Sequence, residues 1–499
     1  MPCSKNLQLL QYIYFIIFSL FAVVNFAFFC YKHKYFLADC FSVCNYNYAM
    51  FKNVMGGHPK GLYLLFSVEM WERFSYYGMR ALLVLYLIQY LFQGMDEKLA
   101  TQYAGNIYGW YTGLVYLTPL IGGYIADKYL GQRKCISIGA IVMAIGLFTL
   151  AASGFECFKN YALIIFALGL TLMIIANGFF KSNISTIVGM LYGDDKQKRD
   201  AGFTIFYMGI NLGAFFSPLV CGTLAYYFGF KYGFMAAGLG IIIGYITYKL
   251  EENKLLGEHG LKPVQTEVVT SSTEEEDVVV RKKLTTREKR RIYALFVLMT
   301  FSIFFWVCFE QAGCSFTLFA ENSTQRQVGE FVIPTGYFQS CNALFIILLA
   351  PVMSMLWSWL AEKNQEPTSV VKFATALGLI GASTLIMAVA AHFTHGDTTL
   401  VSPLWLVFTY LTATLAELCL SPVGLSLVTK LAPAQFASIL MGVWLLSSFF
   451  GNLVAGVFSG FYEHMSHTLF FCILTGIAFV VALILVALIP VLKLWMGKC

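Results

Sequence analysis

The 499-residue chain has few charged residues: 12% are Asp, Glu, Lys or Arg, against 58% that are hydrophobic. Because a soluble domain carries about 25% charged residues, this composition excludes an ordinary soluble protein and indicates a polytopic membrane protein. The net charge of +6 does not indicate a nucleic-acid partner. The basic residues lie in short loops between apolar runs, which is a signal of membrane topology.

The sequence also lacks the common catalytic and metal-binding motifs. It contains no H-E-x-x-H, no G-x-S-x-G and no C-x-x-C, and its 13 cysteines are scattered singly. The missing motifs argue against a membrane-embedded enzyme. We interpret the cysteines as free, small hydrophobic residues, with neither a disulfide framework nor a metal site. We therefore expect no metal and no cofactor.

Apolar runs of at least about 20 residues, the length needed to cross a membrane, recur from Gly61 onward. Twelve spans are predicted in two groups of six: 62–92, 103–125, 134–153, 161–189, 201–227 and 230–249, then 291–313, 334–360, 370–391, 402–428, 435–461 and 468–492. The fold class is therefore all-α and multi-pass. Breaks rich in Lys and Arg alternate with breaks that are poor in them, which predicts that both ends of the twelve-span unit are cytoplasmic.

One long polar segment separates the two groups. Residues 251–290 contain an acidic block, then a basic block, with little apolar periodicity, so we interpret them as a charged cytoplasmic linker. It divides the chain into a six-helix bundle at 61–250 and a second bundle with a short tail at 291–499. Residues Thr286–Arg291 are expected to be helical, leading into the seventh span.

The N-terminal extension, residues 1–60, is open to more than one interpretation. Leu9–Cys30 is long enough to be an additional membrane-spanning helix. Its apolar core is long for a signal peptide, and no A-x-A-like cleavage site follows it. The other alternative is that translation begins at Met50 or Met55 and the extension is not made.

The first span contains a stripe of polar side chains. Glu69, Glu72, Arg73, Tyr76 and Arg80 are spaced i, i+3, i+4, i+7 and i+11, which places them on one face of a helix. An ionisable side chain near the centre of a bilayer costs about 2.5–3.5 kcal/mol, so this face does not point at lipid. Either it forms a structural ladder of ion pairs, or it lines a path for substrate and protons.

Other spans carry isolated polar or aromatic side chains that are candidates for the same cavity. They are Lys181 and Asn211 in the first half, and Trp306, Glu310, Asn342, Glu417 and Trp444 in the second. Structural alternatives remain open for several of them: the lysine can extend to the membrane surface, the first asparagine can join helices, and the tryptophans can serve only in packing.

The two halves differ in charge. The first offers mainly cations, Arg73, Arg80 and Lys181, and the second mainly the anions Glu310 and Glu417. A short zwitterion fits such a cavity, because both of its ends would gain charge-assisted hydrogen bonds. A carboxyl group whose arginine partner moves away also changes its proton occupancy, so the acidic residues are candidate proton carriers. We expect an ion pair between Arg80 and Glu310.

Five segments together resemble the proton-dependent oligopeptide transporter family of the major facilitator superfamily. They are Glu-x-x-Glu-Arg-Phe-x-Tyr-Tyr-Gly at 69–78, GGYIADKYLG after the second span, FTIFYMGINLGAF in the fifth, FEQ in the seventh and ELCLSPVGLS in the tenth. The similarity runs from about Gly56 to the C-terminus. It implies two six-helix bundles and alternating-access symport of di- and tripeptides with protons, without a cofactor.

The resemblance also implies roles for single residues. The residues implied for proton coupling and gating are Glu69, Glu72, Arg73 and Glu310. Those implied to bind the peptide carboxylate are Arg80, Lys181, Tyr76, Tyr77 and Tyr116, and those implied to bind its amino end are Asn211, Asn342 and Glu417. The implied pocket aromatics are Trp306 and Trp444. We expect a monomer in the lipid bilayer, in the cell (inner) membrane if the source is bacterial.

The sequence departs from the family pattern in two places. Gly109 stands where mammalian members have a histidine, which predicts that proton coupling here rests on carboxylates. The charged linker is too polar to supply the two additional hydrophobic helices that many bacterial members insert there. Two alternatives remain open: the same fold with another small substrate (an amino acid, nitrate or a peptide-like conjugate), and a transporter-like receptor without flux.

Overall fold

The computed structural model describes residues 57–193, 195–263, 284–396, 398–433 and 436–497. Within them the first half of the chain forms α3 (Lys60–Tyr86), η1 (Leu87–Leu91), α4 (Glu97–Ile125), η2 (Ala126–Leu130), α5 (Gln132–Ala152), η3 (Glu156–Tyr161), α6 (Ala162–Met190), α7 (Lys196–Phe228) and α8 (Phe230–Leu255). The predicted span at Leu9–Cys30 and the middle of the predicted linker lie outside the described residues.

The second half forms another set of long helices with a small hairpin. Its elements are α9 (Thr286–Phe309), η4 (Glu310–Gly313), α10 (Ser315–Asn322), β1 (Gln327–Val328), β2 (Phe331–Val332), α11 (Tyr337–Glu362), α12 (Ser369–His392), α13 (Leu404–Leu431), α14 (Ala437–Ser459), η6 (Tyr462–His464) and α15 (His467–Met496). The two strands pair antiparallel. The described residues thus contain six long helices on each side of the linker, and the all-α prediction is confirmed.

Ten of the described helical segments are long and apolar enough to cross a membrane, which makes the chain an integral membrane protein. Helices α3 and α4 match them in length, at 27 and 29 residues, but are not among the ten. Helix α3 carries the polar stripe that includes Glu69, Glu72 and Arg73, which lowers its mean hydropathy. The total of twelve spans therefore stays a prediction.

The start of α9 confirms the helix expected at Thr286–Arg291. Thr285 accepts a hydrogen bond from the backbone N–H of Glu288 at 3.2 Å, and the carboxylate of Glu288 accepts one from the backbone N–H of Thr285 at 2.8 Å. This capping box satisfies two N–H groups that a helix end otherwise leaves free. At the other side of the linker, α8 ends at Leu255, five residues inside the segment predicted as linker.

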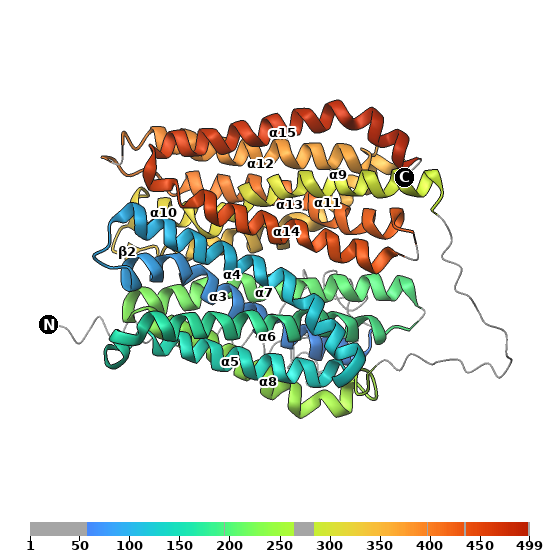
Figure 1. Cartoon of the computed structure of the whole chain (residues 1–499), viewed down its shortest axis with the longest axis horizontal. Helices are drawn as coiled ribbons and strands as arrows, with labels where there is room; N and C mark the ends of the chain where they lie inside the picture. The colour runs from blue at the N-terminus through green and yellow to red at the C-terminus, as the bar shows by residue number, and fades with distance from the viewer. Residues whose placement is uncertain (1–56, 194, 264–283, 397, 434–435, 498–499) are drawn as a thin grey trace, which may run out of the picture.

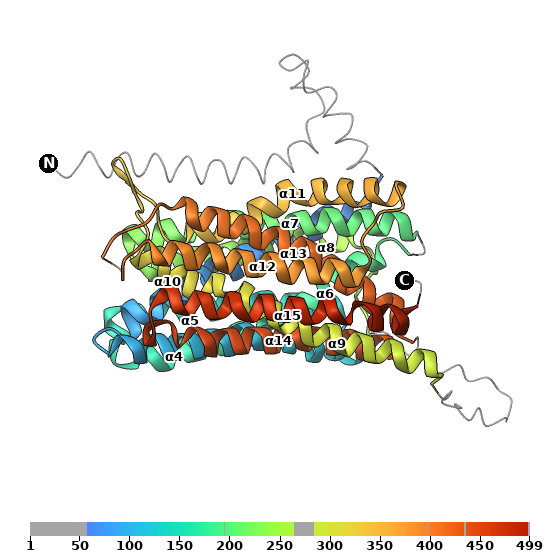
Figure 2. The same ribbon diagram turned by 90° about the horizontal axis from the view of Figure 1, so that it is seen from above.

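The helices run along the long axis of the molecule in two layers. The helices of the second half lie above those of the first in Figure 1, and Figure 2 shows α11 beside α7 where the two layers meet. Large apolar side chains lie exposed on the outside, among them Ile164, Leu250 and Leu483. Such an apolar surface is compatible with a lipid environment, because contact with water would be unfavourable.

The two halves are in close contact at the end opposite the linker. On one side, α4 meets α14 through glycines: a Cβ added to Gly109 would lie 2.9 Å from the Cα of Gly456. On the other side, α7 meets α11, because Thr223 and Tyr337 share a hydrogen bond of 2.8 Å. Ser340 of α11 adds a hydrogen bond of 2.8 Å to the carbonyl oxygen of Phe215 in α7. The small residues let the backbones approach closely, and the hydrogen bonds fix the contact.

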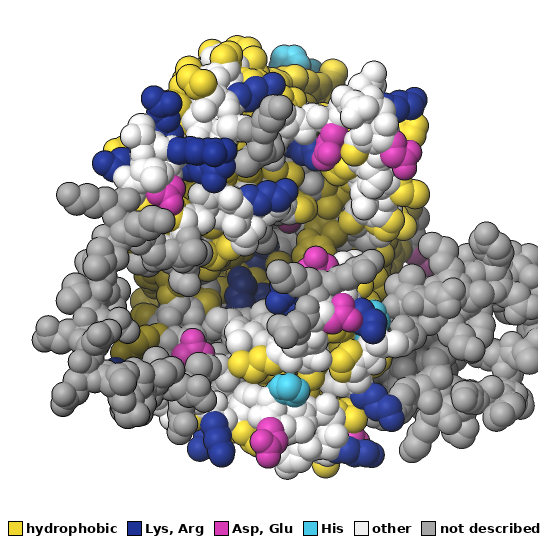
Figure 3. Space-filling model, turned by 90° about the vertical axis from the view of Figure 1, so that its right-hand side faces the viewer, with side chains coloured by type: hydrophobic (Ala, Val, Ile, Leu, Met, Phe, Trp, Pro, Cys, Tyr) yellow, Lys and Arg dark blue, Asp and Glu magenta, His cyan; other side chains and the backbone are white. Residues whose placement is uncertain are grey.

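The linker end is different. Figure 3 looks onto the end of the molecule where α9 begins, and Lys and Arg side chains gather around its rim. Hydrophobic side chains line a hollow between the two halves in the same view. The two ends of the molecule are thus unlike: one is joined by close helix contacts and the other is open and basic.

Candidate functional site

The polar stripe of α3 forms a buried charge cluster. The Nε of Arg73 donates to Glu69 Oε1 at 2.8 Å and lies 2.6 Å from Glu72 Oε2. The three residues are 4%, 3% and 0% exposed, respectively. Their i, i+3 and i+4 spacing on one helix brings them together, as the sequence predicted. Two acids share one arginine at ion-pair distance, and the charge of Lys181 also acts on both of them.

This cluster is incompletely hydrogen-bonded. Among the described residues, Oε1 of Glu72, Oε2 of Glu69 and Nη2 of Arg73 have no hydrogen-bond partner, and Oε2 of Glu72 has only the nearby Nε of Arg73. Burying a polar atom without a hydrogen-bond partner costs about 1–3 kcal/mol of stability, and more when the atom is charged. These atoms therefore have hydrogen-bonding capacity left for water, a proton or another partner.

A second cluster joins the two halves of the molecule. Nη2 of Arg80 in α3 lies 2.6 Å from Glu310 Oε2 in η4, which is the ion pair expected from the sequence. Tyr108 of α4 completes it: its hydroxyl accepts from Arg80 Nε at 2.8 Å and donates to Glu310 Oε2 at 3.0 Å. The carboxylate is positioned by a short 3₁₀ turn that follows α9 at Glu310–Gly313.

Tyr108 was not among the candidates predicted from the sequence. A signal for it was present, because Tyr108 and Tyr116 are eight residues apart on α4 and so share one face of the helix. Tyr108 is fully buried. Its neighbour Gly109 packs against α14, so the tyrosine lies beside the position at which the sequence departs from the family pattern.

Lys181 lies in α6 without a carboxylate partner in the described part of the chain. Its ammonium instead lies 4.1 Å from the centre of the Tyr116 ring, a cation–π contact. Arg80 makes a similar contact with Tyr77 at 5.8 Å, and Arg73 with Tyr76 at 5.6 Å. Each of the three cations thus lies against an aromatic ring, and Lys181 is the one of the three that makes no direct ion pair with a described carboxylate.

The second half contributes an amide–carboxylate pair. Nδ2 of Asn342 in α11 donates to Glu417 Oε2 in α13 at 3.0 Å, and lies the same distance from the hydroxyl oxygen of Thr414. Pro422 lies within α13, just over one turn after the glutamate, where its missing N–H removes a backbone hydrogen bond. The sequence named Asn342 and Glu417 separately, and the structure brings them into contact.

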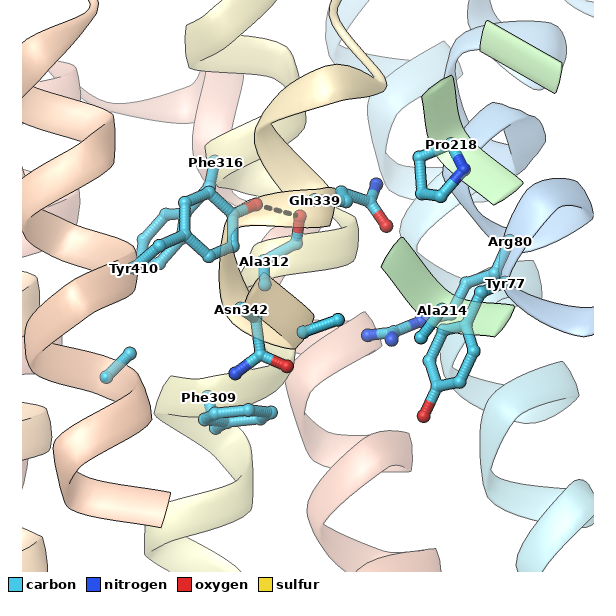
Figure 4. A pocket seen from close by; sticks show the side chains of 12 residues that line it. Tyr77, Arg80, Ala214, Pro218, Phe309, Ala312, Phe316, Gln339, Asn342 and Tyr410 are labelled. Atoms are coloured by element: carbon cyan, nitrogen blue, oxygen red, sulfur yellow. Dashed lines mark hydrogen bonds between the residues drawn. The ribbon is translucent and has the colours of Figure 1, made fainter. Parts of the chain in front are cut away.

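A small cavity of about 30 Å³ lies between these groups. Figure 4 shows Tyr77 and Arg80 on one side of it and Asn342 on the other. Its lining residues are Tyr77, Arg80, Ala214, Pro218, Phe309, Ala312, Phe316, Gln339, Asn342, Ala343, Tyr410 and Ala413. This volume holds water but no larger ligand. Gln339 and Tyr410 are polar lining residues that the sequence reasoning missed, because nothing in their local pattern distinguishes them from packing residues.

Three predicted residues occupy packing or intrahelical positions in this conformation. Asn211 donates to the carbonyl oxygen of Tyr207 in its own helix at 2.9 Å. Trp306 packs edge-to-face on Phe309, with ring centres 5.5 Å apart. Trp444 is 5% exposed and packs on Phe373. None of the three lines the small cavity.

The charged residues named from the sequence come from both halves of the chain. The cations Arg80 and Lys181 come from the first half, and Glu310 and Glu417 come from the second. Within the described residues, no group of three or more His, Cys, Asp or Glu side chains lies together as a metal site would require. The arrangement offers hydrogen-bonding and ionic groups of both signs, which suits reversible binding of a small zwitterion.

The chain is similar over most of its length to known transporters. A sequence model described as the POT family matches residues 133–254 and 254–473. The peptide transporter YePEPT of Yersinia enterocolitica subsp. palearctica serotype O:3 (strain YE-P4) is 34% identical over 493 residues, covering 88% of this chain and 95% of that protein. A di-/tripeptide transporter of Lactococcus lactis subsp. cremoris is 31% identical, covering 88% of this chain and 97% of that protein.

Solved structures give the same similarity. The crystal structure of a mutant of the peptide transporter POT in complex with alafosfalin has a TM-score of 0.79 to this structure and 35% sequence identity. The similarity covers 89% of this chain and 97% of that one.

We predict that Tyr108→Phe weakens the contact between the two halves. Hydrogen bonds to charged groups contribute about 1.5–3 kcal/mol, so the apparent melting temperature in detergent should fall. Because Tyr108 and Glu310 are bonded to each other, combining Tyr108→Phe with Glu310→Gln should lower it by less than the sum of the two single changes. Tyr103→Phe, on an exposed tyrosine of the same helix, is the matched control. Additive losses would contradict the assignment.

Proposed function

The chain belongs to the POT family, and from this premise we propose that it is a proton-coupled symporter that imports di- and tripeptides across the membrane by alternating access. The single observation that carries the proposal is the bonded group of Arg80, Tyr108 and Glu310, which joins the two halves through a pair of opposite charges. A peptide carboxylate competes directly for the same arginine. Binding of substrate and breakage of the contact between the halves are thereby linked.

We assign the two ends of the peptide to the two halves of the site. The carboxylate meets Arg80 and Lys181, with Tyr76, Tyr77 and Tyr116 beside them. The ammonium meets Glu417, with Asn342 and Asn211 on the same side. The ammonium of Lys181 supports this orientation, since it contacts the Tyr116 ring and is influenced by Glu69, Glu72 and Glu310 only beyond ion-pair distance. Trp306 and Trp444 are assigned to the pocket walls in conformations more open than this one.

Proton binding is coupled to peptide binding because Arg80 and Arg73 each have more than one possible anionic partner. When a peptide carboxylate takes Arg80, Glu310 loses its counter-charge in a buried place, so the neutral, protonated form of Glu310 becomes favoured. Glu69 and Glu72 already share the single cation Arg73, so one proton is readily accepted by that pair. A movement of Arg73 toward either acid would release the proton from it.

Alternating access follows from the unlike ends of the molecule. Contacts of α4 with α14 and of α7 with α11 close the end opposite the linker, and Figure 3 shows a hollow at the linker end. We assign this conformation to the state that is open toward the cytoplasm, because basic loops mark the cytoplasmic side. Rocking of one half against the other would expose the site to the opposite side.

The proposed setting is the cell (inner) membrane if the source is bacterial, with the linker and the C-terminus in the cytoplasm. We propose that the protein functions as a monomer, because its two halves already supply both sides of the site. No cofactor is required, since the coupling ion is the proton and the described side chains are enough to carry it.

The decisive experiment is uptake of labelled dialanine into proteoliposomes. With an inward proton gradient, dialanine should accumulate above its external concentration, and an uncoupler should abolish the accumulation because it removes the driving force. Empty liposomes are the control. If no peptide enters under either condition, while the purified protein remains folded, the substrate assignment is wrong and another small zwitterion must be sought.

We predict that Glu417→Gln weakens binding of peptides with a free amino group by about tenfold, because a charge-assisted hydrogen bond is replaced by a neutral one. Peptides with a blocked amino group should lose far less. The measurement is inhibition of dialanine uptake by a free and a blocked peptide of the same sequence. Glu362→Gln, on an exposed side chain at the end of α11, is the matched control. Equal losses for both peptides would exclude the assigned role.

We predict that Glu72→Gln abolishes accumulation of dialanine but leaves its exchange across the membrane measurable. The amide keeps the shape of the side chain and removes the group that accepts the proton, while the peptide contacts lie elsewhere. Counterflow into preloaded proteoliposomes measures exchange without a gradient. Accumulation retained at the level of the original protein would refute the role of Glu72 in coupling.

A further inference from the structure

An apolar groove lies on the outer surface of the first bundle, away from the charged site. It has a volume of about 410 Å³ and lies between the end of α7 and the start of α8. Its lining residues are Leu224, Phe228, Tyr232, Met235, Ala236 and Leu239. The four from α8 are spaced i, i+3, i+4 and i+7, so they form one continuous stripe along that helix.

The shape of the groove comes from the junction of the two helices. Gly229 joins α7 to α8 with a φ of +105°, a conformation that side-chain-bearing residues rarely adopt. The helices therefore turn back at this point with a furrow between them. Phe228 and Leu239 are 47% and 53% exposed, so the furrow opens outward. Both helices are apolar membrane-crossing segments, and the surroundings of the groove are consequently lipid.

A cation is held beside the groove. The ammonium of Lys231 lies 4.6 Å from the centre of the Phe155 ring and 5.4 Å from that of Tyr232, which itself lines the groove. The stem of the lysine is fixed against Gly154, where an added Cβ would lie 3.1 Å from the Cβ of Lys231. The lysine is thus positioned by its neighbours and does not extend freely into solvent.

Among the described residues, no acidic side chain neutralises this lysine. Glu156 directly follows Phe155, whose ring contacts Lys231, but the Glu156 carboxylate lies 3.8 Å from the ammonium of Lys159. The first turn of α8 contains no acidic residue either. A net positive charge therefore lies at one end of an apolar groove, at the end of the molecule opposite the linker.

We propose that this groove binds one anionic phospholipid, with an acyl chain along the stripe of α8 and the phosphate against Lys231. The apolar lining matches a hydrocarbon chain, and the isolated cation matches a headgroup of negative charge. An overall anionic lipid is favoured over a zwitterionic one, because no acidic side chain described beside Lys231 would receive the cationic part of a zwitterionic headgroup. The site is separate from the transport site and does not depend on which substrate is carried.

Native mass spectrometry of the purified full chain tests the proposal. With phosphatidylglycerol and phosphatidylcholine of identical acyl chains added in equal amounts, the protein should retain one phosphatidylglycerol several-fold more often than phosphatidylcholine. Lys231→Gln should remove this preference. Ala236→Trp should reduce retention of both lipids, because the indole fills the groove. Lys159→Gln removes the same charge at the same end of the molecule and should leave retention unchanged.

A second measurement distinguishes loss of lipid binding from misfolding of a variant. The apparent melting temperature of each variant without lipid shows whether it is folded, and Ala236→Leu replaces Ala236→Trp if the larger side chain disrupts the bundle. Added phosphatidylglycerol should raise the melting temperature of the original protein and of Lys159→Gln, but not that of Lys231→Gln. Equal lipid retention by all variants, or loss of retention in Lys159→Gln as well, would overturn the proposal.

Discussion

Burial of charge in a medium that cannot solvate it is the constraint on which the rest of this structure depends. Arg80, Glu310 and Tyr108 come from three elements, and each supplies a hydrogen bond that the other two need. Removing one partner from a buried pair costs more than the pair itself contributes, because a charge is left uncompensated. This buried ion pair is thus one of the contacts that join the two halves.

The same constraint explains why the charges are divided between the halves. Arg80 of the first half pairs with Glu310 of the second, and Arg80 also lines the small cavity of about 30 Å³. In the proposed mechanism, a zwitterion with matching ends replaces this contact with its own. The Glu69–Glu72–Arg73 cluster lies on one helix and does not join the halves, which suits it to proton exchange while they move.

Close packing at one end makes the charged contact effective. Gly109 and Gly456 let α4 and α14 meet backbone to backbone, and Thr223 and Tyr337 join α7 to α11. Interfaces of this kind have discrete packed arrangements and do not deform continuously. Breaking one ion pair at the centre can therefore be followed by separation of the whole end, which is how a small ligand would change the conformation of two six-helix bundles.

The long helices, the all-α fold and the helix at Thr286–Arg291 could be predicted from the sequence, because hydrophobic runs are a local property of the chain. The ion pair of Arg80 with Glu310 was expected on other grounds, since buried charges of opposite sign need partners. Four features became visible only in the folded molecule: Tyr108 joins this pair, Gln339 lines the cavity, Asn211 bonds to its own helix, and an apolar groove opens beside Lys231. These features depend on which helix faces meet. The pairing of helix faces depends on packing between segments far apart in sequence, and the sequence of a single span does not show which helix will pack against it.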